Sequence, residues 1–168
     1  MTFPRTVLLA ALVAAPGLAA AEEPTGCAAF RWPVEHERAA LAAPKRLPVA
    51  NGGALTYEAA MTLALAPFAE AGLPQPPERS PKITPSFAGH FTLAAPPKPG
   101  VYKVTLASEG WIDVVDNGVF LHPKGFSGAL DCEGARKSVK FDLPGRPVAV
   151  QFSNVRSSDI AVIVTPAD

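Results

Sequence analysis

Alternation of apolar and polar residues dominates the second half of the chain. From Gly100 onward, short segments carry apolar residues at every second position and are separated by Gly and Pro turns. Side chains two residues apart lie on the same face of a strand, so each segment predicts a strand with one buried face. The expected buried faces are Tyr102, Val104 and Leu106; Val139, Phe141 and Leu143; Val148, Val150 and Phe152; and Ile160, Val162 and Val164.

The first half of the chain has fewer segments with a regular spacing of apolar residues. Residues 34–41 favour a short helix, because glutamate, arginine and alanine are good helix formers there. Apolar residues at period two predict a strand at Met61, Leu63 and Leu65.

Residues 67–99 contain nine of the 19 prolines. Proline fixes φ and removes a backbone donor, so this region predicts a long, stiff surface excursion. Within it, residues 86–96 (SFAGHFTLAAP) predict one strand, with Phe87 and Phe91 as core residues.

Together these patterns predict an all-β fold. Short strands at about ten-residue spacing, divided by turn residues, are typical of a β-sandwich. We expect a single antiparallel, jelly-roll-like β-sandwich of about eight strands with a short N-terminal helix. It would form one domain over residues 22–168.

The first 21 residues resemble an export signal. Arg5 precedes an apolar stretch that is too short to span a membrane, and Ala19 and Ala21 suit cleavage after Ala21. The remaining 147 residues would carry 14 basic and 15 acidic side chains, because only Arg5 is removed. This balance argues against nucleic acid as a partner. No later segment predicts a membrane span, so we expect a periplasmic or secreted protein.

The chain contains two cysteines, Cys27 and Cys132. In an oxidising compartment such a pair predicts a disulfide, here between the mature N-terminus and a late strand. Lipid attachment to Cys27 is the alternative, although Pro24 occupies a position where an aliphatic residue is required.

The Asn117-Gly118 pair between two apolar runs predicts a β-hairpin, because a type I′ turn needs positive φ at both central residues. Continuing this register outward would place Ile112, Val114 and Leu121 on the core face. It would also pair Asp113 with His122 and Trp111 with Lys124.

The opposite face of this hairpin is the candidate ligand-binding surface. An aromatic platform between an acid and a base suits an unknown small molecule, a glycan or an envelope protein. Such cross-strand pairs more commonly serve only to stabilise a hairpin, without any ligand. The candidate residues are Trp111, Asp113, His122 and Lys124.

The alternative functional hypothesis is a metal-dependent enzyme. The three histidines, His36, His90 and His122, would be its ligands in a cupin-like β-barrel dioxygenase. The chain lacks the His-x-His pattern that such an enzyme carries on one strand. We therefore expect no metal and no cofactor, and we interpret Gly125 and Gly128 around Ser127 as loop glycines.

Two segments resemble a known family. GVYKVTLASEGWIDVVDNGVFL and VKFDLPGRPVAVQFS with IAVIVTP resemble bacterial pre-peptidase C-terminal domains over residues 86–166. The resemblance implies a secreted β-sandwich that accompanies enzymes and has no catalytic residues of its own. The whole mature chain resembles small exported bacterial proteins of uncharacterised function.

The sequence contains no recognisable set of catalytic residues. It therefore favours a binding or structural role over catalysis. The leading hypothesis is an exported, non-catalytic binding or accessory β-sandwich of unknown ligand, such as a glycan or an envelope component. The metal-dependent dioxygenase and a purely structural envelope protein remain the alternatives.

Overall fold

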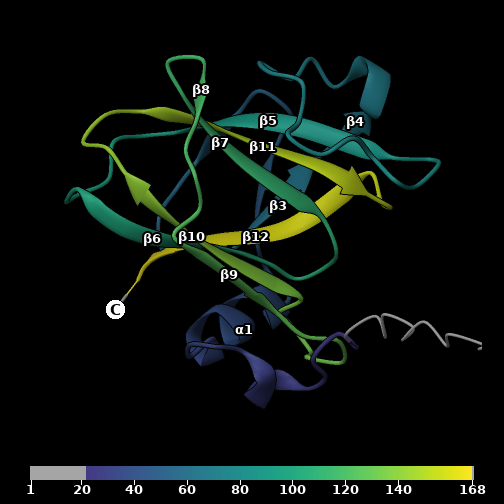
Figure 1. The fold of residues 1–168 in the computed structure, drawn as a ribbon, viewed down its shortest axis with the longest axis vertical. Helices are drawn as coiled ribbons and strands as arrows, with labels where there is room; N and C mark the ends of the chain where they lie inside the picture. Colours follow the sequence, from purple (N-terminus) through teal and green to yellow (C-terminus); the bar gives the residue numbers. More distant parts are fainter. Residues whose placement is uncertain (1–21, 168) are drawn as a thin grey trace, which may run out of the picture.

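The computed structural model describes residues 22–167, so the predicted signal peptide and its cleavage site lie outside the described residues. Residues 22–167 form twelve strands, one α-helix and two short 3-10 helices. The strands make two mixed sheets (Figure 1), which confirms a mostly β protein with a short N-terminal helix. None of the helices in these residues is long and apolar enough to cross a membrane.

The first sheet has the strand order β1-β3-β12-β6-β10-β9. Its strands are β1 (Leu47–Val49), β3 (Met61–Ala64), β6 (Gly100–Leu106), β9 (Gly125–Gly128), β10 (Lys137–Leu143) and β12 (Asp159–Pro166). Strands β1 and β3 are parallel, and the other neighbours are antiparallel. The expectation of loop glycines at Gly125 and Gly128 is wrong, because both residues pair with β10.

The second sheet has the order β2-β5-β11-β7-β8, with β4 also paired to β5. Its strands are β2 (Ala54–Leu55), β4 (Ala66–Pro67), β5 (Phe87–Leu93), β7 (Trp111–Asp116), β8 (Val119–Phe120) and β11 (Val148–Val155). Strands β2 and β5 are parallel. The expectation of a purely antiparallel fold is therefore wrong. Strands of two or three residues are too short to show a period in the sequence.

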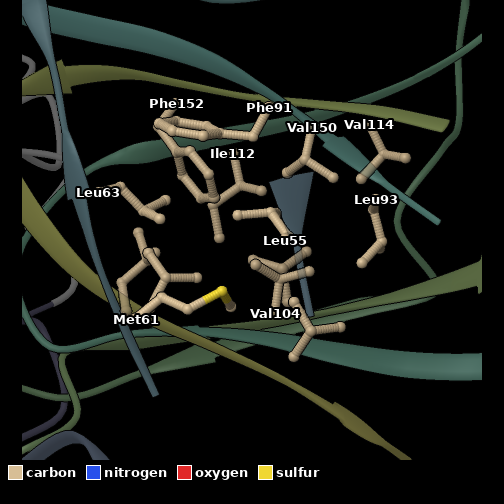
Figure 2. Close-up of a cluster of buried hydrophobic side chains, with 14 of the residues drawn as sticks. Leu55, Met61, Leu63, Phe91, Leu93, Val104, Ile112, Val114, Val150 and Phe152 are labelled. Carbon is tan, nitrogen blue, oxygen red and sulfur yellow. The ribbon is translucent and has the colours of Figure 1, made fainter. Parts of the chain in front are cut away.

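Side chains from both sheets make one hydrophobic core. In Figure 2, Phe91 and Phe152 of the second sheet lie in the same cluster as Met61, Leu63 and Val104 of the first. The four alternating faces predicted from Gly100 onward are all buried. Full burial of each such side chain contributes roughly 1.5 to 3 kcal/mol relative to exposure, so this cluster is the main source of stability.

Residues 25–46 cover the outer face of the first sheet, and we call them the N-terminal cover. They include the 3-10 helix η1 (Cys27–Ala29) and the helix α1 (Glu35–Ala42). Figure 1 shows α1 below the first sheet, on the side away from the second sheet, and α1 contacts β12. The indole Nε1–H of Trp32 donates to Ser138 Oγ at 3.1 Å, and Arg46 Nε–H donates to Thr62 Oγ1 at 3.0 Å.

Residues 68–86 lie on the outer face of the second sheet, and we call them the proline-rich cover. Apart from the 3-10 helix η2 (Phe68–Glu70), they lack regular structure. The backbone of Gln75 hydrogen-bonds the Gln151 side chain on β11, and Lys82 N–H donates to Asn154 Oδ1 at 2.8 Å. The strand predicted within residues 86–96 is confirmed as β5, where Phe91 is buried and Phe87 is half-buried. The irregular part of the expected excursion is interrupted further by η2.

Candidate functional site

The turn that anchors the candidate surface forms as the sequence predicts. Asn117 and Gly118 have φ values of 50° and 81°, which are the two positive angles that a type I′ turn requires. Asp116 pairs with Val119 and Val115 with Phe120. The N–H of Leu121 donates to the carbonyl of Val114 at 2.8 Å, which extends the hairpin by one further hydrogen bond.

Beyond Leu121 the chain leaves the hairpin. Lys124 N–H donates to the Lys140 carbonyl of the first sheet at 2.8 Å, and β9 begins at the next residue. The predicted pairs Asp113–His122 and Trp111–Lys124 are therefore wrong. Pro123 has no N–H to continue the ladder, and the chain changes sheets there. His122 is exposed, and Lys124 forms an exposed ion pair with Asp142 at 3.6 Å.

Asp113 lies opposite Gln151 of β11 and is only 2 % exposed. Its carboxylate accepts hydrogen bonds from three neutral donors. These are the Trp111 indole at 2.6 Å, the Gln151 amide at 3.3 Å and the Glu78 backbone N–H at 3.4 Å. Burial raises the pKa of Asp113, and it outweighs these hydrogen bonds, which lower it. Asp113 thus holds the proline-rich cover on the sheet and does not face solvent.

Trp111 remains partly exposed at the start of β7. Two cations lie near its ring: the Arg79 guanidinium carbon at 4.6 Å from the ring centroid and Lys137 Nζ at 5.2 Å. Arg79 comes from the proline-rich cover, whereas Lys137 comes from β10 of the first sheet. We call Arg79, Trp111 and Lys137 the Trp111 surface.

Lys137 is held in place by two partners. Its ammonium donates to the Gly110 carbonyl at 2.8 Å and lies 3.8 Å from the Glu109 carboxylate. Burial lowers the pKa of Lys137, and the nearby charges of Arg136 and Arg79 lower it further, while Glu109 opposes them. The Trp111 surface therefore combines a flat ring, fixed by its indole N–H, with two positively charged groups.

Sequence reasoning missed Arg79 and Lys137 at this surface. Arg79 lies 32 positions before Trp111 in a proline-rich stretch, and Lys137 lies on the other sheet. Their approach depends on how the two sheets and the cover pack. The only local hint was the excess of cations over acids at the start of β10, Arg136 and Lys137.

The three histidines do not come together. His36 is exposed on α1 and His122 is exposed after β8, while His90 Nδ1 lies 3.2 Å from the Ala71 carbonyl. Among residues 22–167, no group of three or more His, Cys, Asp or Glu side chains is arranged to hold a metal ion. The histidine set proposed for a dioxygenase is therefore wrong.

Cys27 and Cys132 form the predicted disulfide, with their Cα atoms 4.7 Å apart. The bond engages the Cys27 thiol that lipid attachment would need, which contradicts the lipidation alternative. Beside it lies an open cavity of about 390 Å³, whose lining includes Cys132, Glu109, Glu133 and Arg136. Arg136 binds the carboxylates of Glu23 and Glu109 there, so its charge is already matched.

The chain matches no protein-family model, no curated protein and no solved structure.

Proposed function

We propose that the protein is an exported, non-catalytic binding or accessory β-sandwich whose ligand is an anionic glycan or envelope component. The ligand would lie on the Trp111 surface. The main observation behind this proposal is the partly exposed Trp111 ring with Arg79 and Lys137 beside it. A flat ring packs against the C–H face of a sugar, and the cations attract carboxylate or phosphate groups.

The rigidity of Trp111 supports this role. Its indole N–H is bound to the buried Asp113, which fixes the ring before any ligand arrives. A fixed aromatic side chain loses little conformational entropy on binding, so more of the contact energy remains as affinity.

Two buried acids support a non-catalytic role. Glu37 is bound by Lys103 and Thr165, and Asp113 is bound by three neutral donors. Both carboxylates are thus used to hold the covers. Neither is free to act as a general acid or base on a substrate.

The disulfide supports export. Such bonds persist in oxidising compartments such as the periplasm or the extracellular space and are rare in the cytosol. The shared core of the two sheets supports the β-sandwich architecture.

Tryptophan fluorescence tests the proposal directly. The Trp32→Phe variant leaves Trp111 as the single fluorescent indole, because the chain has two tryptophans. Peptidoglycan fragments, whose stem peptides bear carboxylates, should change its emission saturably. Uncharged chitin oligosaccharides of the same length serve as the matched ligand control.

Arg79→Ala, made in the same background, should weaken binding about tenfold by removing an exposed cation. Retention of full affinity in this variant would contradict the proposed surface. Absence of saturable binding for every anionic glycan tested would instead favour the purely structural envelope protein.

A further inference from the structure

Among the described residues 22–167, the outer edge of β9 carries backbone groups that no neighbouring strand binds. Ala129 N–H donates toward β10, to the Arg136 carbonyl at 3.3 Å, whereas Leu130 N–H donates away from it, to the Pro24 carbonyl at 2.8 Å. Backbone groups alternate in direction along a strand, so those of Phe126 and Gly128 point away from β10 as well. In the part of the chain that the structure describes, β9 is the last strand of its sheet.

A short segment near the start of the described residues pairs with one end of this edge. Residues 24–26 run parallel to Leu130, and Gly26 N–H donates to the Leu130 carbonyl at 2.7 Å. The next hydrogen bond of a parallel ladder would join an N–H of Pro24 to the Gly128 carbonyl. Proline has no N–H, so this pairing ends at Leu130. Within residues 22–167, no strand therefore pairs with the outer edge along Phe126 and Gly128.

Aromatic side chains with bound cations surround the open edge. Phe126 is 61 % exposed, with the Arg31 guanidinium carbon 5.7 Å from its ring centroid. Lys140, which pairs with Gly125 of β9, places its Nζ 4.5 Å from the Trp32 ring centroid. The exposed Phe126 ring offers an apolar face to a partner, and the Arg31 and Lys140 side chains have capacity for a further anion.

The positive charge near the β9 edge favours a negatively charged partner. Arg31, Lys124 and Lys140 lie near the Gly125–Phe126 end of β9, and of these only Lys124 is offset by a carboxylate, that of Asp142. Arg136 and Lys137 lie beside Gly128, where Glu23 and Glu109 already match their charges. A second copy of this chain would bring the same cations to the same edge, which is unfavourable. An extended acidic peptide satisfies both the outward backbone groups and the positive charge.

We propose that β9 binds an acidic peptide segment of a partner protein by strand addition. The segment pairs with the backbone of Phe126 and Gly128, places an apolar side chain on Phe126 and presents carboxylates to Arg31, Lys124 and Lys140. This site lies on the first sheet, and it does not depend on a ligand at Trp111.

Calorimetry with two model peptides tests the proposal. An acetylated, amidated hexapeptide of alternating glutamate and valine should bind the disulfide-bonded protein at least tenfold more tightly than its lysine–valine counterpart. Its affinity should fall as salt rises. Equal binding of the two peptides would overturn the acidic preference, and no binding of the glutamate peptide at millimolar concentration would overturn the site.

Two substitutions at Phe126 distinguish the contribution of its backbone N–H to peptide binding from that of its ring. Phe126→Pro removes the outward N–H without touching the ladder to β10, and proline is tolerated at such an edge position. Phe126→Ala removes the ring and keeps the N–H. We expect at least a tenfold loss for proline and a smaller loss for alanine. Equal losses would contradict strand addition.

Amide NMR on the unsubstituted protein tests the same site even if one of these variants fails to fold. The glutamate peptide should shift the amides of Phe126 and Gly128 and slow their exchange with solvent. Shifts confined to the Trp111 surface would overturn the proposal, as would concentration-dependent dimerisation in place of peptide binding. Arg31→Gln should weaken binding about threefold, whereas the exposed Arg156→Gln on the turn between β11 and β12 should leave it unchanged.

Discussion

The two covers occupy equivalent places, one on the outer face of each sheet, but different chemistry holds them. The N-terminal cover is attached by a disulfide and by a buried ion pair, in which Lys103 Nζ lies 2.8 Å from Glu37 Oε1. The proline-rich cover has no disulfide, and the buried acid that binds it, Asp113 of β7, accepts hydrogen bonds only from neutral donors. The comparison shows that a buried carboxylate can hold a covering segment on a sheet whether or not an opposite charge compensates it.

The two acids also titrate in opposite directions. Burial raises the pKa of Glu37, but hydrogen bonds from Lys103 and Thr165, with the Lys103 charge, lower it below its ordinary value. For Asp113, burial prevails over its hydrogen bonds and the net pKa is raised. An opposite charge at hydrogen-bonding distance accounts for the difference.

Removal of the disulfide should have the largest effect on stability. Replacing Cys27 and Cys132 together by alanine opens a loop with a sequence separation of 105. The chain-entropy model predicts a loss of roughly 4 to 5 kcal/mol in the free energy of unfolding. Urea unfolding followed by circular dichroism measures it. A loss below about 1 kcal/mol would show that noncovalent contacts alone hold the N-terminal cover.

Breaking the ion pair should rank next. Glu37→Gln leaves the Lys103 ammonium buried and unpaired, which costs about 3 to 5 kcal/mol at neutral pH. The double variant Glu37→Leu, Lys103→Met should recover most of this loss, because it removes both charges. Glu70→Gln is the matched control, since Glu70 is exposed. If the double variant is no more stable than Glu37→Gln, the unpaired charge is not the cause.

Truncation of Asp113 should cost less. Asp113→Ala leaves the donors of Trp111, Gln151 and Glu78 without their acceptor, which costs about 1 to 3 kcal/mol. Asp113→Asn keeps one acceptor oxygen and removes the buried charge, so its loss should be smaller. The same urea titration compares them. A larger loss for asparagine than for alanine would mean that the ionised form is what holds the proline-rich cover.

Strand alternation allowed much of the fold to be predicted. Residues such as Val148, Val150 and Phe152 are buried on one face as expected, and the turn at Asn117 and Gly118 forms because its sequence demands positive φ. These features depend on neighbours in the sequence. The disulfide was predictable as well, because only one pairing of two cysteines exists.

The candidate surface was harder to predict because its contacts are long-range. The hairpin register was extended past Pro123, where the chain in fact changes sheets, so His122 and Lys124 were placed beside the wrong partners. Strand β9 was missed because glycines at both of its ends resemble a loop. Nothing local to Asp113 indicates that Gln151 and the backbone of Glu78 bind it.

The pH dependence of two charge-neutralising variants tests the contrast between the acids most directly. A lowered pKa means that the stabilisation from Glu37 is present above the ordinary carboxyl pKa of roughly 4 and is lost as the pH falls through its folded value. A raised pKa means that the contribution of Asp113 is present below that pH and is lost as the pH rises through its folded value.

The unfolding free energies of Glu37→Gln, Asp113→Asn and the parent protein should therefore be measured from about pH 3 to about pH 7. Relative to the parent, Glu37→Gln should become less stable as the pH rises, and Asp113→Asn should become more stable. Curves with these opposite slopes are the result that we predict. Two curves that run in the same direction would contradict the account of how the covers are held.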